Sequence, residues 1–127
     1  MTTRTLVVLS SALEMATGVL LIAIPGLAGR ALLGQDLSNA GIVMGRLAGL
    51  GLFSLGISCW PGQDDVAPRV ARALFVYNLL AALYFGYLRL GAGFVSYLLW
   101  PVCILHAVLA ILLVLPNKQQ TRPGYLR

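Results

Sequence analysis

The chain has 127 residues, of which 59% are hydrophobic and only 10% are charged. A typical soluble domain is about 45–50% apolar and about 25% charged, and a small domain exposes a large share of its residues to water. This composition therefore excludes a soluble globular domain, a disordered chain and a disulfide scaffold. The net charge of +5 is the balance of nine Lys and Arg residues against four Asp and Glu residues. Because the basic residues are scattered, they do not indicate a nucleic-acid-binding surface, on which such residues are clustered.

Apolar segments follow one another along the chain, at about residues 6–24, 40–60, 66–88 and 94–115. Each is close to the ~20 residues that a helix needs to cross ~30 Å of hydrocarbon. Helices are expected because backbone polar groups in lipid must be hydrogen-bonded within the protein. The sequence thus predicts an all-α polytopic membrane protein, a four-transmembrane-helix bundle that forms one integral membrane domain over residues 1–127.

The connections and the basic residues predict the topology. The connections 61–65 and 89–93 are short, so the spans that they join are expected to be antiparallel neighbours. The longer connection 26–39 is expected to hold a short interfacial helix. Basic residues are more numerous on the side of the two termini: Arg4, Arg69, Arg72, Lys118, Arg122 and Arg127 lie there, against Arg30 and Arg89 on the other side. This bias places both termini in the cytoplasm, with a cleaved signal peptide at the first segment as a minor alternative.

Strongly polar side chains interrupt all four spans. An ionisable group at mid-membrane costs roughly 2.5–3.5 kcal/mol on insertion scales, so Glu14, Arg46 and His106 each need a physical reason to be there. At 1.5 Å per residue, Glu14, Asn78 and His106 are expected at one level, about 12–15 Å from the cytoplasmic edge. Arg46 enters from the opposite side, and its long side chain could reach Glu14. We expect these four residues to form an interior polar cluster in which Glu14 and Arg46 are an ion pair. Such a cluster would either lock the helices together or serve a proton or a small ligand.

Small and aromatic residues complete the expected interior. Gly41, Gly45 and Gly49 form a doubled G-x-x-x-G pattern, which favours the close approach of another helix. Side chains expected to line a pocket are Tyr77, Tyr84 and Cys103. Because Cys59 and Cys103 lack metal-ligand spacing, no metal site is predicted, and the sequence identifies no cofactor.

A resemblance covers essentially the whole chain. The ordered pieces L-E-M-A-T-G, P-G, L-L-G, G-R-L-A-G, C-W, V-Y-N and L-W-P…L-H resemble those of small, uncharacterised bacterial four-helix membrane proteins near the DoxX-like group. The resemblance implies a compact four-helix bundle in the bacterial inner (cytoplasmic) membrane, and it supplies no reaction for the polar residues. The C-x-x-C of quinone-linked thiol oxidoreductases is missing from the sequence, so disulfide chemistry of that type is not expected.

These observations lead to three functional hypotheses. The leading one is an accessory or binding module whose polar cluster holds the bundle or a small ligand. The first alternative is a proton-coupled small-molecule transporter or channel-like oligomer. Oligomerisation would be needed because four helices are few for a transport path. The second is a membrane-embedded enzyme that uses Glu14 and His106 as acid and base. The expected partners are the lipid bilayer and either further copies of the chain or a larger membrane complex, without nucleic acid.

Overall fold

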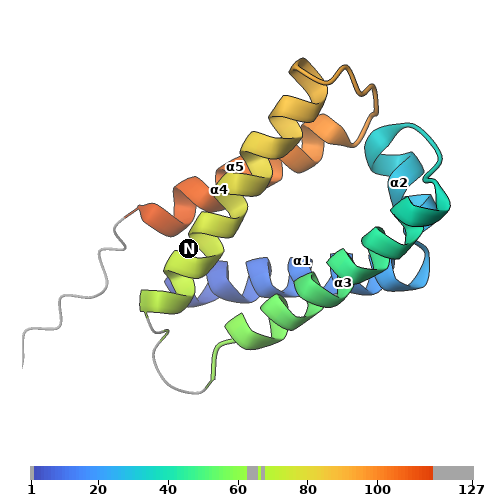
Figure 1. Cartoon of the computed structure of the whole chain (residues 1–127). Helices are drawn as coiled ribbons and strands as arrows, with labels where there is room; N and C mark the ends of the chain where they lie inside the picture. Colours follow the sequence, from blue (N-terminus) through green and yellow to red (C-terminus); the bar gives the residue numbers. More distant parts are fainter. Residues whose placement is uncertain (1, 63–65, 67, 116–127) are drawn as a thin grey trace, which may run out of the picture.

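The computed structural model describes residues 2–62, 66 and 68–115. These residues are all-helical in their regular structure and form α1 (Thr3–Ala23), α2 (Pro25–Leu33), α3 (Asn39–Cys59), α4 (Pro68–Leu90) and α5 (Leu99–Val114) (Figure 1). The prediction of an all-α chain is confirmed. The four expected apolar segments correspond to α1, α3, α4 and α5, and α2 lies in the connection that was expected to hold a short helix.

Helix length decides which segments qualify as membrane spans. Among the described helices, α1, α3 and α4 are long and apolar enough to cross a membrane, which is compatible with a helical membrane protein. In contrast, α5 has only 16 residues, or about 24 Å at 1.5 Å per residue. It begins at Leu99 rather than near residue 94, because Gly93 adopts a φ of +73° and the Ser96 hydroxyl accepts a hydrogen bond from the Leu98 backbone N–H at 3.3 Å. Length alone therefore supports three spans, and the fourth belongs to the proposal below.

Local signals explain where the helices begin and end. Thr2 and Ser38 precede α1 and α3, and each side-chain oxygen accepts a backbone N–H from the first turn, which satisfies a donor that the helix leaves free. Pro25 occupies the start of α2, where its fixed φ and missing N–H are tolerated. Gly34 ends α2 in the left-handed conformation, with a φ of +73°, which glycine adopts without steric cost.

The long helices are arranged in two pairs. In Figure 1, α1 packs along α3 and α4 packs along α5, and the two pairs diverge from the end where the N-terminus lies. Contact between the pairs runs mainly through α1, which touches both α4 and α5. At the other end the Ser96 hydroxyl donates a hydrogen bond to the Ala31 carbonyl oxygen, so the α4–α5 connection is tied to α2.

Glycines allow the backbones of α1 and α3 to touch. A Cβ on Gly49 would lie 2.7 Å from the Gly18 carbonyl oxygen. In the same way, a Cβ on Gly18 would lie 2.7 Å from the Gly49 carbonyl oxygen. Two turns further along α3, a Cβ on Gly56 would lie 2.7 Å from the Ser11 carbonyl oxygen. No real Cβ atom tolerates such distances, so the separation of the two helices depends on glycine at these positions.

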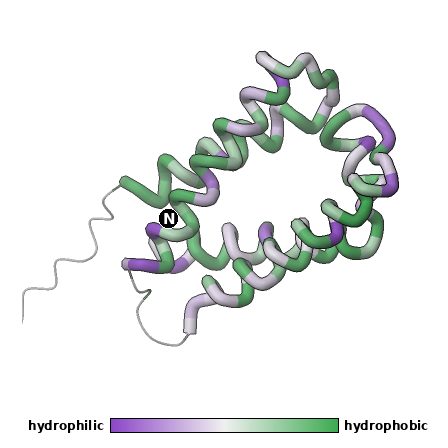
Figure 2. Tube along the Cα trace, viewed as in Figure 1, coloured by the Kyte–Doolittle hydropathy of each residue, from purple (hydrophilic) through white to green (hydrophobic). Residues whose placement is uncertain are grey.

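Apolar side chains cover most of the outer surface. Figure 2 shows hydrophobic residues along α1, α3, α4 and α5, with hydrophilic residues mainly towards the helix ends and at the connection between α2 and α3. Leu47, Leu80 and Leu83 are each 60% exposed or more. The buried core is small by comparison, with Val7, Cys59 and Leu74 packed together near the N-terminal end. An apolar exterior of this extent suits contact with lipid.

Candidate functional site

Polar side chains from three helices gather where the two helix pairs meet. They are drawn from α1, α4 and α5, which are otherwise apolar at this level. The group consists of Ser10, Ser11 and Glu14 from α1, Tyr77 and Asn78 from α4, and His106 from α5. Hydrogen bonding divides this group into two parts with different properties.

The first part is a hydrogen-bonded clasp formed by Ser10, Asn78 and His106. The Asn78 side chain is fully buried, and its Nδ2 donates to Ser10 Oγ at 2.9 Å and to the Leu74 carbonyl oxygen at 2.8 Å. Its Oδ1 lies 2.8 Å from His106 Nδ1. One amide group therefore joins α1, α4 and α5, and every polar atom of that amide has a partner.

The clasp fixes the tautomer of His106. Because both hydrogens of Asn78 Nδ2 are directed to acceptors, Asn78 Oδ1 must accept, and His106 Nδ1 must carry the hydrogen. In the neutral ring, Nε2 then presents a lone pair. Tyr77 meets the imidazole edge-on, with ring centroids 5.9 Å apart, and Phe85 stacks on it at 5.7 Å. These contacts hold the ring in one orientation.

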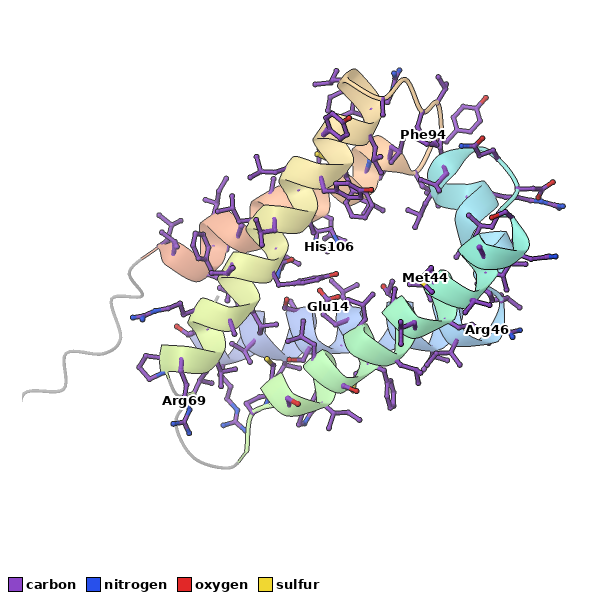
Figure 3. All side chains as sticks on the ribbon, viewed as in Figure 1. Glu14, Met44, Arg46, Arg69, Phe94 and His106 are labelled. Carbon is purple, nitrogen blue, oxygen red and sulfur yellow. The ribbon has the colours of Figure 1, made fainter. Side chains whose placement is uncertain are left out.

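The second part, which we call the acidic site, consists of Ser11, Glu14 and Tyr77. Ser11 and Glu14 are buried, with exposed fractions of 0% and 2%. The Tyr77 hydroxyl lies close enough to the Glu14 carboxyl group to interact with it. However, Ser11 Oγ and Glu14 Oε1 have no hydrogen-bond partner within the part of the chain that the structure describes. Figure 3 shows Glu14 and His106 on the facing sides of the two helix pairs. The acidic site is thus buried but incompletely satisfied, whereas the clasp is complete.

Arg46 lies outside this cluster, which corrects the expected ion pair. It is exposed, and Figure 3 shows it towards the α2 end of α3, away from Glu14. The register of the helices explains the separation. Because Gly18 faces Gly49 in an antiparallel pair, Arg46 is level with the part of α1 near Leu21, about 10 Å along the axis from Glu14. An exposed arginine at this depth can extend its side chain towards the membrane surface.

The three glycines that were expected to pack against another helix make different contacts. Gly49 lies at the α1–α3 contact, whereas a Cβ on Gly45 would approach Pro25 Cβ at 3.2 Å, and one on Gly41 would approach Leu37 Cβ at 3.3 Å.

Of the expected pocket-lining residues, only Tyr77 belongs to the acidic site. Tyr84 is 60% exposed. Cys103 donates to the Ala82 carbonyl oxygen at 3.3 Å and so connects α5 to α4. Tyr84 therefore lies on the outer surface, and Cys103 belongs to the contact between α4 and α5 rather than to the site.

Ser11 belongs to the acidic site but was not predicted from the sequence. Its position three residues before Glu14 places it on the same face of α1, which is the signal that could have identified it. As ligands, the acidic site offers one carboxyl group, one serine hydroxyl and one phenol. Among the described residues, no group of three or more His, Cys, Asp and Glu side chains could hold a metal ion. The chemistry open to the acidic site is therefore hydrogen bonding to a ligand, pairing with a cation, or exchange of a proton.

Comparison of the chain with protein-family models, curated proteins and solved structures gives no match. The DoxX-like resemblance accordingly stays a prediction, and the function has to be argued from the site itself.

Proposed function

We propose that the chain is a four-span integral protein of the bacterial inner membrane with both termini in the cytoplasm. The three long apolar helices support this placement, as does α5, which lies beside α4 and has the apolar composition of a span. A helix of about 24 Å can span where the bilayer thins locally.

The distribution of arginines supports the orientation. The beginning of α1, the end of α3, the beginning of α4 and the end of α5 all lie at the N-terminal end of the molecule (Figure 1). This end carries Arg4, Arg69 and Arg72, and the opposite end carries Arg30 and Arg89. The other basic residues assigned to the cytoplasmic side, Lys118, Arg122 and Arg127, lie outside the described residues. The positive-inside rule then favours a cytoplasmic N-terminal end.

Within this bundle, the acidic site acts as a binding module for a small ligand. The observation that carries the proposal is the pair of buried atoms without a partner, Ser11 Oγ and Glu14 Oε1. Leaving a buried polar group unsatisfied costs about 1–3 kcal/mol, and such groups in native proteins call for an explanation. A bound ligand that satisfies both oxygens supplies one, because their cost is then removed whenever the site is filled.

The charge of the site defines what it can bind. The Tyr77 hydroxyl is directed to Glu14, and among the described residues no arginine or lysine forms an ion pair with that carboxyl group. A ligand that donates a hydrogen bond or carries a positive charge would complement Glu14, whereas an anion would be repelled by the ionised carboxylate. The transporter and enzyme alternatives need further features, a path through both leaflets or a reactive group beside the ligand. The binding module needs only the acidic site.

Native mass spectrometry tests this function. The protein released from its own membranes into mild detergent should retain a small molecule in stoichiometric amount. Glu14→Leu should lose this molecule, whereas Arg46→Gln, which changes an exposed ionisable residue, should keep it. Absence of any retained mass, or retention that Glu14→Leu leaves unchanged, would contradict the proposal.

A further inference from the structure

A groove runs along the α4–α5 pair, apart from the acidic site. It has a volume of about 470 Å³, within the range of small-molecule sites. Small residues form its floor, with Ala82 and Ala110 buried and Ala107 half-buried. Larger residues such as Leu83 and Ile111, which are 63% and 59% exposed, form its walls. All ten residues that line the groove are apolar or cysteine, so its occupant must be apolar.

The length of the groove matches one leaflet of a membrane. On α4 the lining extends from Phe75 to Leu83, and along α5 and the residue that follows it the lining extends from Cys103 to Leu115. At 1.5 Å per residue, these stretches measure about 12 Å and about 18 Å. Half of a hydrocarbon core of ~30 Å is about 15 Å. The groove is therefore about as long as an acyl chain that lies within a single leaflet.

Two arginines stand at one end of this groove. Arg72 precedes Phe75 by three residues and Leu79 by seven, so it lies on the face of α4 that lines the groove. Arg69 lies one turn earlier, at the beginning of α4 (Figure 3). Both arginines are exposed, and neither forms an ion pair with another described residue. Two exposed positive charges thus adjoin the apolar groove at the end of the helix pair.

We propose that this surface is a binding site for one anionic glycerophospholipid. Arg72 and Arg69 hold the phosphate, and one acyl chain lies in the groove between α4 and α5. Arginine suits this role because its guanidinium group matches the geometry of phosphate oxygens. Basic sites beside transmembrane helices on the cytoplasmic side are known to favour anionic lipids. The inference rests on the membrane placement proposed above and is independent of the acidic site.

The charge of the site favours a lipid over a second copy of the chain. In a two-fold symmetric dimer built on this surface, the same patch of both copies would face each other. The arginines of one copy would then approach those of the other at the same membrane level. An anionic headgroup instead neutralises them while its chain fills the groove.

Lipid binding to the delipidated full-length protein tests the proposal. In a neutral detergent, phosphatidylglycerol and phosphatidylcholine are each titrated and bound lipid is counted by native mass spectrometry. One phosphatidylglycerol should bind more tightly than phosphatidylcholine. Arg69→Gln and Arg72→Gln should each weaken its binding about five-fold, while Arg46→Gln on α3 should have no effect.

A second variant tests the groove itself. Ala107→Leu places a larger side chain in the groove and should weaken the binding of both lipids, whereas Ala48→Leu, at an exposed position of α3, should not. Glycerol phosphate without acyl chains should fail to compete. Equal binding of the two lipids that the arginine variants leave unchanged would overturn the proposal, as would a lipid-free dimer that Ala107→Leu dissociates.

One further variant separates the two proposals. Glu14→Leu should leave lipid binding intact, because the acidic site and the groove share no residue. An arginine-dependent lipid preference in a protein that retains no ligand at Glu14 would show that only the acidic-site assignment fails. A Glu14-dependent ligand in a protein without lipid preference would show that only the groove assignment fails.

Discussion

The contact between Gly18 and Gly49 makes a sharp prediction for Gly49→Ala. The new Cβ would lie 2.7 Å from the Gly18 carbonyl oxygen and 2.9 Å from Leu21 Cβ. Ordinary van der Waals contact begins at about 3.4 Å, so α1 and α3 would have to separate by about 0.7 Å at this point. A backbone oxygen cannot move aside independently of its helix, so the whole crossing is affected.

The expected cost follows from the contacts that are lost. A gap of 0.5–1 Å forfeits about a quarter to a half of each van der Waals interaction, and overpacking in a close-packed interior costs about 1–3 kcal/mol. Gly51→Ala is the matched control, because it lies in the same helix and a Cβ there meets nothing within 4 Å. That variant should be neutral or more stable by up to about 1 kcal/mol, since alanine favours helix formation over glycine.

The assay is reversible unfolding in detergent micelles with increasing sodium dodecyl sulfate, followed by circular dichroism. We expect the free energy of unfolding to fall by about 1–3 kcal/mol for Gly49→Ala relative to wild type and to be maintained for Gly51→Ala. Equal free energies for the two variants would refute the close approach of α1 and α3 at this glycine.

Three further predictions concern topology, local electrostatics and the clasp. A cysteine at Gln35 should react with a membrane-impermeant thiol reagent in intact cells and one at Thr2 should not, in a background without native cysteines; the reverse pattern would invert the topology. The pKa of Asp36 should lie below its ordinary value because the Arg30 side chain donates a hydrogen bond to it. Its stabilising contribution is then full above the unfolded-state pKa and lost as the pH falls through the folded-state value; an NMR titration in which Arg30→Gln fails to raise this pKa would contradict the pairing. Nitrogen-15 NMR at a pH where His106 is neutral should show the hydrogen on Nδ1, and the Nε2–H tautomer would be inconsistent with the clasp.

The positions of the helices could be predicted because each apolar run is long enough to be identified in the sequence. The predicted beginning of α5 was wrong, because residues 94–98 include apolar side chains yet are held outside the helix. The contact of Ser96 with Ala31 that accompanies this turn joins residues 65 positions apart. Such a contact leaves no trace in local composition.

The polar cluster was likewise predicted only in part. Depth along each helix was enough to put Glu14, Asn78 and His106 at one level, and the structure brings these residues together. The expected pair of Glu14 with Arg46 failed because the register of α1 against α3 depends on glycine contacts, which depth within one helix does not reveal. The difference between the satisfied clasp and the unsatisfied acidic site likewise depends on which side chains meet in space.

The clasp stabilises the fold, whereas we propose that the acidic site serves a ligand. Replacing Asn78 by leucine leaves Ser10 and His106 Nδ1 without their partners, and each buried unsatisfied group costs about 1–3 kcal/mol. Replacing both members of the Glu14–Tyr77 pair, as Glu14→Leu/Tyr77→Phe, removes a buried carboxyl group and the hydroxyl beside it together. Such paired replacement by apolar groups of similar shape is nearly neutral or stabilising.

The most direct measurement compares the free energies of unfolding of Asn78→Leu and Glu14→Leu/Tyr77→Phe with wild type in ligand-free detergent solution. Asn78→Leu should lose about 2 kcal/mol or more, and Glu14→Leu/Tyr77→Phe should keep or gain stability. A loss for the double variant as large as that for Asn78→Leu would contradict a ligand-binding role of the acidic site, because Glu14 and Tyr77 would then stabilise the bundle in the same way as the clasp.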